Sequence, residues 1–512
     1  MAGGELTRRA VGGILWLSGG KAAYAVLQLL VLAVLARLVS PSEFGVLTAA
    51  LVVVNFSGIV SQLGMGPALV QRPELEARHI RTAFVVSVAL GLVLALGLWL
   101  VAPAAADFFH SERVAGVLRA LAWIFPLQGL GIVAESLARR ELRFRWLAML
   151  DVKAYVVGYG MVGVPLALLG AGVWALVAAE ITDIVVRTGI LLRDRPPPRR
   201  LLPETRALRE LFRFGSGLTI GKLANFLALQ GDNVVVGRTL GPAALGVYGR
   251  AFHLMSAPVV TLGAVLDHAL FPTMARVQHD LPRLAAAYRR GVALVTVAVL
   301  PASIVLLLLA PEFVGVLLGP QWTDAVLPFQ ILALGMVLRT AGKMGDALAR
   351  ATGAVYRRAW RQVLYAALVI GGAWVGRRWG VPGVAVAAML ALLVNYILMT
   401  HLSLRLTGSD WWTLALAQAP AVALTAILAG VTWLVASVLR EHAAGPLGTL
   451  LVSSGAAGAT ALGLARMAPN LFLGQDVLWM IDTLRSMRPR RAAPSVEHPV
   501  LELATKPRGE AS

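Results

Sequence analysis

Long apolar segments alternate with short polar connections along most of this 512-residue chain. Residues 82–104, 292–311 and 421–439 carry no charged side chain at all. A helix needs about 20 mainly apolar residues to cross the hydrocarbon core of a bilayer. The pattern therefore predicts about fourteen transmembrane helices, at residues 13–36, 44–70, 82–104, 114–137, 147–169, 172–192, 214–236, 245–272, 291–311, 325–348, 360–376, 381–404, 413–439 and 446–465.

The apolar segments also repeat. Residues 19–50 return at 220–251 with a constant offset of 201, and a second offset of 211 relates Glu135 to Asp346. The positions matched by the first offset include Lys21 with Lys222, Arg37 with Arg238, Pro41 with Pro242 and Gly45 with Gly246. Six predicted spans precede the second copy, so both copies enter the membrane from the same side. We therefore predict an all-α integral membrane protein with two parallel six-helix repeats and two additional C-terminal helices.

The arginines divide the connections into two sets. Most lie in alternate connections, which the positive-inside rule assigns to the cytoplasm, together with both termini. A basic, proline-rich stretch separates the repeats and predicts a cytoplasmic linker. The expected organisation is an N-terminal lobe at 1–193, the linker at 194–209, a C-terminal lobe at 210–406, two further spans within 407–466 and a cytoplasmic tail at 467–512.

The net charge of +19, from 46 Lys and Arg against 27 Asp and Glu, would indicate nucleic acid in a soluble protein. Because the basic clusters alternate with membrane spans, we expect no nucleic-acid partner. The chain has no cysteine, which excludes disulfides, thiolate metal sites and cysteine nucleophiles. A phosphate-binding loop is excluded at Gly221-Lys222, because Ser216 replaces the first glycine and Leu223 replaces the Mg²⁺ ligand. We expect a transporter without a cofactor or metal site, and no enzyme.

Two polar stripes interrupt the apolar helices. Lys21, Tyr24 and Gln28 share one helical face, and the repeat-related face carries Lys222, Asn225, Asp232 and Asn233. A charge at mid-bilayer costs at least about 2.5–3.5 kcal/mol, so such stripes are expected to face the interior or a water-filled cleft. We predict substrate-binding residues for an anionic substrate, namely Lys21, Tyr24, Gln28, Lys222 and Asn225. The alternative is that Lys21 snorkels to the cytoplasmic surface, about 10 Å away.

Acidic residues within the spans are candidates for ion coupling. Asp232 and Asp267 are the two candidates, and His268 is positioned in sequence to relay a proton. Against this role, Asp232 is expected near the outer end of its span and Asp267 near the inner end, where water solvates charge. A third group has the spacing of an internal ion pair on one helix, and consists of Glu180, Asp183 and Arg187.

Several stretches resemble one family of transporters. The stretch 35–45 (LARLVSPSEFG) is similar to the opening of Wzx-type polysaccharide flippases, in the polysaccharide transporter branch of the MOP superfamily. The further matches are 62–64 (QLG), 68–71 (ALVQ), 139–144 (RRELRF), 170–176 (GAGVWAL), 232–237 (DNVVVG) and 246–248 (GVY). The resemblance covers roughly residues 5–465, and none of its motifs is catalytic.

The resemblance implies two six-helix lobes around a central cavity, in a bacterial inner membrane. It implies export of undecaprenyl-pyrophosphate-linked oligosaccharides for exopolysaccharide, capsule or O-antigen synthesis, with a polysaccharide polymerase and co-polymerase as partners. Without a nucleotide site, we expect H⁺ or Na⁺ antiport or the substrate gradient to drive transport. The alternatives are a lipid II flippase, which uses the same lipid carrier, a MATE-like cation or drug antiporter, which needs an acid-lined cavity, and an assembly scaffold, which needs no polar stripe.

Overall fold

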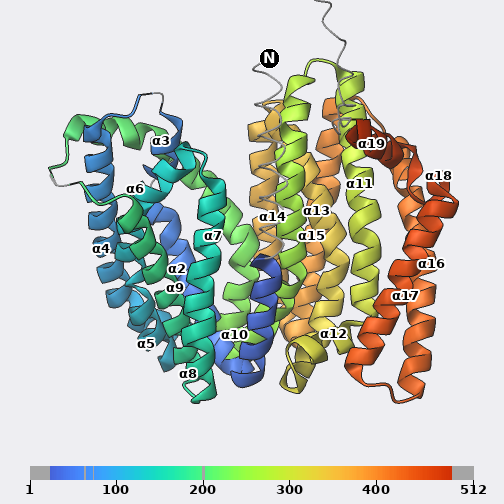
Figure 1. Cartoon of the computed structure of the whole chain (residues 1–512), viewed down its shortest axis with the longest axis horizontal. Helices are drawn as coiled ribbons and strands as arrows, with labels where there is room; N and C mark the ends of the chain where they lie inside the picture. Colours follow the sequence, from blue (N-terminus) through green and yellow to red (C-terminus); the bar gives the residue numbers. More distant parts are fainter. Residues whose placement is uncertain (1–23, 63–64, 73, 199–201, 487–512) are drawn as a thin grey trace, which may run out of the picture.

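The computed structural model describes residues 24–62, 65–72, 74–198 and 202–486, and within them every regular element is a helix (Figure 1). Nine segments of this part are long and apolar enough to cross a membrane: Pro41–Ile59, Ala77–Phe108, Glu112–Arg140, Phe144–Leu168, Leu281–Leu308, Pro320–Ala351, Val355–Thr407, Trp411–Glu441 and Pro446–Met467. The all-helical membrane fold is thereby confirmed. The count of fourteen spans and the division into two repeats stay predictions.

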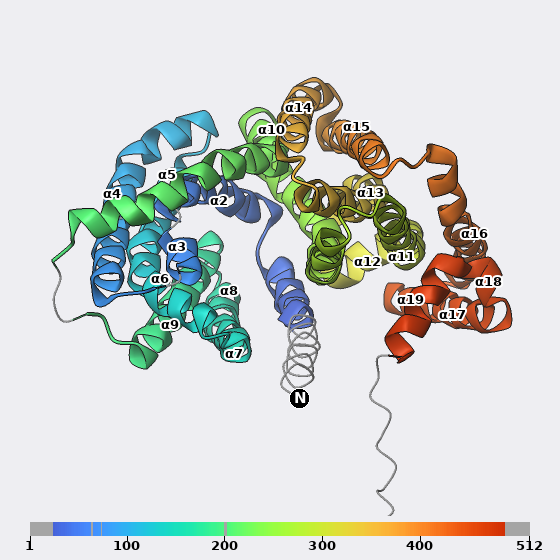
Figure 2. The same cartoon turned by 90° about the horizontal axis from the view of Figure 1, so that it is seen from above.

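The N-terminal lobe begins with the apolar helix Tyr24–Leu38, which stands apart from the lobe's other helices, between the two lobes (Figure 2). Its other elements are α2 (Pro41–Gln62), α3 (Met65–Gln71), α4 (Ala77–Phe108), α5 (Glu112–Leu121), α6 (Ile124–Arg140), α7 (Phe144–Tyr155), the π-helix η1 (Val156–Gly163), α8 (Val164–Leu168) and α9 (Val173–Asp194). At the start of α2, Glu43 accepts a hydrogen bond from the Ser40 amide, while Ser40 Oγ accepts one from the Glu43 amide. This reciprocal capping box explains why α2 begins here.

The C-terminal lobe is built on one long helix, α10 (Thr205–Arg276), which turns back at Gly241. Gly241 has a φ of +86°, a conformation that glycine adopts without strain, and Pro242 then starts the second half. The remaining elements are α11 (Leu281–Leu308), α12 (Ala310–Leu317), the 3₁₀ turn η2 (Pro320–Ala325), α13 (Val326–Ala351), α14 (Val355–Gly376), the 3₁₀ turn η3 (Arg377–Trp379) and α15 (Gly380–Thr407).

Four helices follow this lobe: α16 (Trp411–Glu441), α17 (Pro446–Met467), α18 (Pro469–Phe472) and α19 (Gly474–Ser486). They form a separate group beside α11 (Figures 1 and 2). The short helix α19 is tied to α11 by Asp476, which pairs with Arg289 at 2.9 Å, and by Trp479, whose ring centroid lies 3.6 Å from the guanidinium of Arg290.

The two lobes lean together at one end of the molecule and diverge toward the other (Figure 1). The converging end holds α8, α12 and the bend of α10, whereas α3, α19 and the first turns of α10 lie at the opposite end. Seen from above, the first part of α10 runs across the top of the N-terminal lobe before it descends toward its bend (Figure 2). The single helix α10 therefore links the two lobes, and the direct contacts between them lie where they converge.

Candidate functional site

Two repeat-related glycines bring the lobes into backbone contact. A Cβ added to Gly45 would lie 1.7 Å from the carbonyl oxygen of Pro242, and a Cβ added to Gly246 would lie 1.8 Å from that of Pro41. No side chain fits at such distances, so only glycine allows α2 and the second half of α10 to approach this closely. We call this contact the glycine crossing. Its two halves are related by the sequence offset of 201.

Arg250 lies one helical turn beyond Gly246 and reaches across to the N-terminal lobe. Its guanidinium carbon lies 4.7 Å from the ring centroid of Phe44, and it interacts electrostatically with Tyr155 and Tyr159. Its buried Nε has no hydrogen-bond partner, and no ion pair joins Arg250 to an acid within the described ranges. A guanidinium that lies against aromatic rings, with no acid beside it, keeps its positive charge uncompensated for an anionic ligand.

A row of tyrosines continues from Arg250 into the N-terminal lobe. The rings of Tyr24 and Tyr155 meet edge to face with centroids 5.5 Å apart, and Tyr155 stacks on Tyr159 at 4.7 Å. Tyr159 lies in the π-helix η1 and donates a hydrogen bond to Glu180 of α9. Of the predicted substrate-binding residues, Tyr24 is thus placed in this row, and Gln28 forms a side-chain hydrogen bond with it.

The first half of α10, in the C-terminal lobe, contains a buried acidic residue, Asp232. Asp232 is only 3% exposed and accepts a hydrogen bond of 2.5 Å from the Tyr248 hydroxyl. Arg339 interacts electrostatically with this carboxylate and donates to the Tyr365 hydroxyl at 3.4 Å. Asp232 lies in the last turns before the bend of α10 at Gly241, and the expectation that water solvates it there is wrong, because Tyr248 from beyond the bend packs against it and leaves it buried.

Among the other predicted site residues, the structure describes the side chains of some and not of others. Asn225 is exposed on α10, while its neighbour on the stripe, Asn233, is buried and donates to Gln230 at 2.8 Å. Lys21 lies outside the described residues. Lys222 and Asp267 belong to α10, but their side chains lie outside the described part, as does that of His268. Whether the two lysines face each other stays a prediction.

The ion pair expected within α9 is wrong. Arg187 forms its ion pairs with Asp151 of α7 at 2.9 Å and with Glu135 of α6 at 3.2 Å, and it interacts with Asp183 electrostatically without forming an ion pair. Glu180 is occupied by the Tyr159 hydroxyl instead. Neighbouring helices supply better-oriented partners than the same helix does, so the acids and Arg187 join α6, α7 and α9 together.

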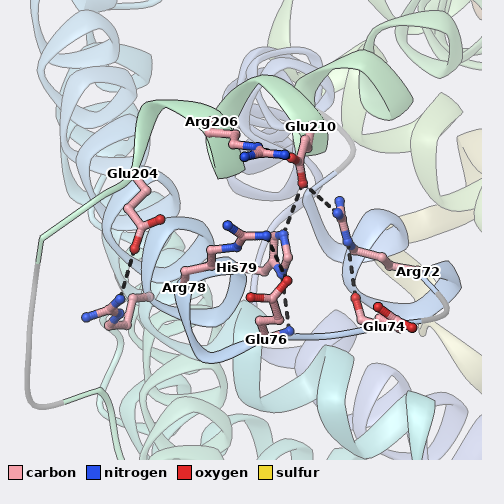
Figure 3. A network of polar contacts seen from close by, with 9 residues as sticks. Arg72, Glu74, Glu76, Arg78, His79, Glu204, Arg206 and Glu210 are labelled. Atoms are coloured by element: carbon pink, nitrogen blue, oxygen red, sulfur yellow. Dashed lines mark hydrogen bonds and ion pairs between the residues drawn. The ribbon is translucent and has the colours of Figure 1, made fainter.

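A second polar network fixes the start of α10 to the N-terminal lobe (Figure 3). Glu210 accepts a hydrogen bond of 2.5 Å from Arg72, and its Oε2 lies 3.2 Å from Nε2 of His79. Nδ1 of His79 accepts from the Glu76 amide, so Nε2 carries the proton that it donates to Glu210. The hydrogen bonds from His79 and Arg72 lower the pKa of the Glu210 carboxyl to about 2. The network therefore stays ionised at neutral pH, and the predicted linker is anchored where it enters α10.

Comparison with known proteins decides the family. The sequence profile of the family described as "Polysaccharide biosynthesis protein" matches residues 34–327, which is more than half of the chain. The chain belongs to the polysaccharide biosynthesis protein family. The predicted resemblance to a family of polysaccharide biosynthesis proteins is confirmed.

Two relatives illustrate the family. The chain is 34% identical over 316 residues to the succinoglycan biosynthesis transport protein ExoT of Rhizobium meliloti, covering 61% of this chain and 63% of that one. It therefore spans less than two thirds of the length of this relative. It is 24% identical over 405 residues to the lipopolysaccharide biosynthesis protein WzxC of Escherichia coli, covering 77% and 80%.

Two solved structures show the fold of this family member. The lipid II flippase MurJ in an inward closed conformation superposes with a TM-score of 0.72 at 9% identity, covering 92% of this chain and all of the other. An inward-facing MATE family multidrug resistance transporter of the MOP superfamily gives 0.59 at 17% identity, covering 77% and 99%. At these identities the likeness concerns the fold alone.

Sequence reasoning missed Arg250 and Arg339, although both are charged residues inside predicted spans. That position alone marks a residue as a functional candidate in a membrane protein. Glu210 was missed because it directly follows the linker, whose excess of basic residues dominates the charge of this region. Within the described residues, no group of three or more His, Cys, Asp or Glu side chains is arranged to hold a metal ion.

Proposed function

We propose that this protein moves undecaprenyl-pyrophosphate-linked oligosaccharides across the bacterial inner membrane for synthesis of exopolysaccharide, capsule or O-antigen. The observation that carries the proposal is the uncommitted guanidinium of Arg250, which lies between the lobes on an aromatic support. A pyrophosphate matches the forked donors of a guanidinium, and the low-dielectric surroundings strengthen the pairing. The family membership supports export of a polysaccharide precursor.

The geometry suggests how the parts of such a substrate are bound. The pyrophosphate is held at Arg250, and sugar rings have hydroxyl and aromatic partners along Tyr24, Tyr155 and Tyr159. Lys21, Gln28, Lys222 and Asn225 remain proposed as further contacts on the two polar stripes. The polyprenyl chain stays in lipid, so the protein has to replace only the hydration of the polar head.

Transport then requires the two lobes to open alternately toward the two sides of the membrane. We assign the diverging end to the cytoplasm, because the connections α3–α4, α6–α7 and α9–α10, which contain Arg72, Arg143 and Arg195, lie there (Figure 1). Both termini are then cytoplasmic, and the glycine crossing closes the outer side. A polymerase and co-polymerase would receive the exported repeat units at that outer side.

Deleting the gene should leave the lipid-linked oligosaccharide on the cytoplasmic face and abolish the surface polymer. Extraction of membrane lipids followed by mass spectrometry measures the accumulated carrier and identifies its glycan. An accumulation of lipid II would assign the chain to peptidoglycan precursor flipping instead. Sensitivity to cationic drugs with an unchanged lipid pool would indicate a cation antiporter.

Complementation of that deletion tests the two lysines. Lys21→Ala and Lys222→Ala should each reduce polymer export, because each removes a cation from a proposed substrate-binding stripe. Wild-type export by both variants, with the polymer still dependent on the gene, would favour a scaffold function in which the stripes have no substrate to bind.

Asp232 is proposed as the coupling group for H⁺ or Na⁺, and Asp232→Asn should make export independent of the ion gradient. The carboxylate is buried and held by Tyr248, so gain or loss of a cation there changes the charge inside the lobe. Export is measured in inverted membrane vesicles with and without ionophores. Asp324→Asn, in an exposed turn, is the matched control. Unchanged ionophore sensitivity in Asp232→Asn would remove Asp232 and leave Asp267 as the candidate.

A further inference from the structure

Two arginines related by the sequence repeat each bind the other lobe at the converging end. Arg37, near the end of the helix Tyr24–Leu38, donates a hydrogen bond of 2.6 Å to the carbonyl oxygen of Val316. Arg238, at the end of the first half of α10, donates to the carbonyl oxygens of Asp107 at 3.2 Å and Phe108 at 2.8 Å. The two arginines are separated by the offset of 201 that also relates the two glycines of the crossing.

Both arginines bind the same kind of acceptor. Val316 is the penultimate residue of α12, and Asp107 and Phe108 are the last two residues of α4. The final carbonyls of a helix lack partners within the helix and carry the negative end of its dipole. A guanidinium placed there satisfies the carbonyls and balances the dipole. Each lobe thus supplies an arginine that binds the free carbonyl groups at a helix end of the other lobe.

The same end of the molecule contains a further set of contacts between the lobes. The indole of Trp322, which is fully buried, donates to the Ala36 carbonyl at 2.7 Å and packs edge to face on Phe44 at 5.5 Å. Gln321 donates to the carbonyls of Ala36 and Val39. These carbonyls also lie at the end of a helix, so one mode of recognition recurs across the whole contact.

We propose that Arg37 and Arg238 are a reciprocal latch that holds the lobes together at this end and sets how often it opens. Opening separates each guanidinium from the carbonyls of the opposite lobe, so loss of the arginine weakens the closed state without touching the proposed binding residues. The assignment of this end to the outer side rests on the proposed function. The latch itself rests only on the contacts.

Labelling of a single cysteine tests the latch directly, because the wild-type chain contains none. Thr48 lies about one helical turn after Gly45 on α2, and a Cβ added to Gly249 of α10 would lie 3.4 Å from its Cγ2. The reporter Thr48→Cys is introduced into the full chain, and its reaction with a membrane-impermeant maleimide is followed in right-side-out vesicles. Arg37→Ala, Arg238→Ala and the double variant are compared with the reporter alone.

Each single substitution should raise the labelling rate about three- to tenfold, the range for a lost hydrogen bond to a charged group that is partly exposed. The double variant should approach the product of the two effects. The matched control is Arg377→Ala, which removes an arginine that stacks on Trp374 within the C-terminal lobe, and it should leave the rate unchanged. Export by each variant is measured in parallel.

An unchanged labelling rate in the folded double variant, or an equal rise in Arg377→Ala, would overturn the latch. A rise that appears only in inverted vesicles would keep the latch and reverse the proposed orientation of the protein. A rise in the expected vesicles with no lipid-linked oligosaccharide accumulating in the deletion strain would keep the latch and refute the proposed substrate. The failure of one proposal is thus distinguishable from the failure of the other.

Discussion

Gly45→Ala should stop export almost completely while leaving the protein folded in the membrane. The new methyl group would overlap the carbonyl of Pro242, which is backbone and cannot rotate away. Overpacking of this kind costs about 1–3 kcal/mol, equivalent to about 5–150-fold in the equilibrium between closed and open states. The cost applies only when the crossing is closed, so the outer end should stay open. Gly246→Ala should behave alike, because its clash with Pro41 is equivalent.

The measurement combines polymer export with labelling of the Thr48→Cys reporter. Both glycine variants should lose export and gain labelling, and the double variant should show no further loss of export. Gly97→Ala is the matched control, because a Cβ at Gly97, also within a membrane helix, meets no atom within 4 Å. Its export and labelling should equal those of the wild type. Export that persists in Gly45→Ala with low labelling would show that the crossing is not a gate.

The helices could be predicted from the sequence because hydropathy and helix-breaking residues act locally. The observed breaks before Pro41 and at Gly319 fall in the gaps between predicted spans, at 37–43 and 312–324, and Pro320 begins η2. Arg37, Gly45 and their counterparts were also visible, but only as markers of a repeat. Their function in the contact depends on the opposite lobe, since Arg37 and Val316 are 279 residues apart. Hydropathy carries no information about such a distant partner.

The candidate site shows where local rules fail. The i,i+4 rule paired Asp183 with Arg187, but the packing of α9 on α6 and α7 supplies Arg187 with Asp151 and Glu135. Such pairs on one helix contribute only about 0.2–0.5 kcal/mol, so a partner on a neighbouring helix readily replaces them. For Asp232 the solvation was misjudged, since the bend at Gly241 folds Tyr248 back onto it, and hydropathy along one helix does not show such a contact.

Arg250→Ala should reduce polymer export about 10- to 150-fold, which corresponds to the loss of one charge-assisted hydrogen-bonding group worth about 1.5–3 kcal/mol. The reason is that Arg250 has no acidic partner among the described residues, so its charge is available to the substrate and not to the fold. Export by Arg250→Lys should lie between that of the wild type and that of Arg250→Ala, because lysine keeps the positive charge but lacks the forked donors that match a pyrophosphate. Export is measured by complementation of the deletion strain.

Binding by the purified protein separates this role from a structural one. Detergent-solubilised wild type should bind undecaprenyl pyrophosphate, Arg250→Ala should bind it more weakly by a similar factor, and Arg119→Ala should match the wild type. Arg119 is a suitable control because it also stacks on an aromatic ring, that of Trp99, at 4.7 Å, but both residues lie within the N-terminal lobe. Equal binding and export by a folded Arg250→Ala variant would contradict the proposed site. Lost export with unchanged binding would instead assign Arg250 to the movement of the lobes, since it packs on Phe44 beside the glycine crossing.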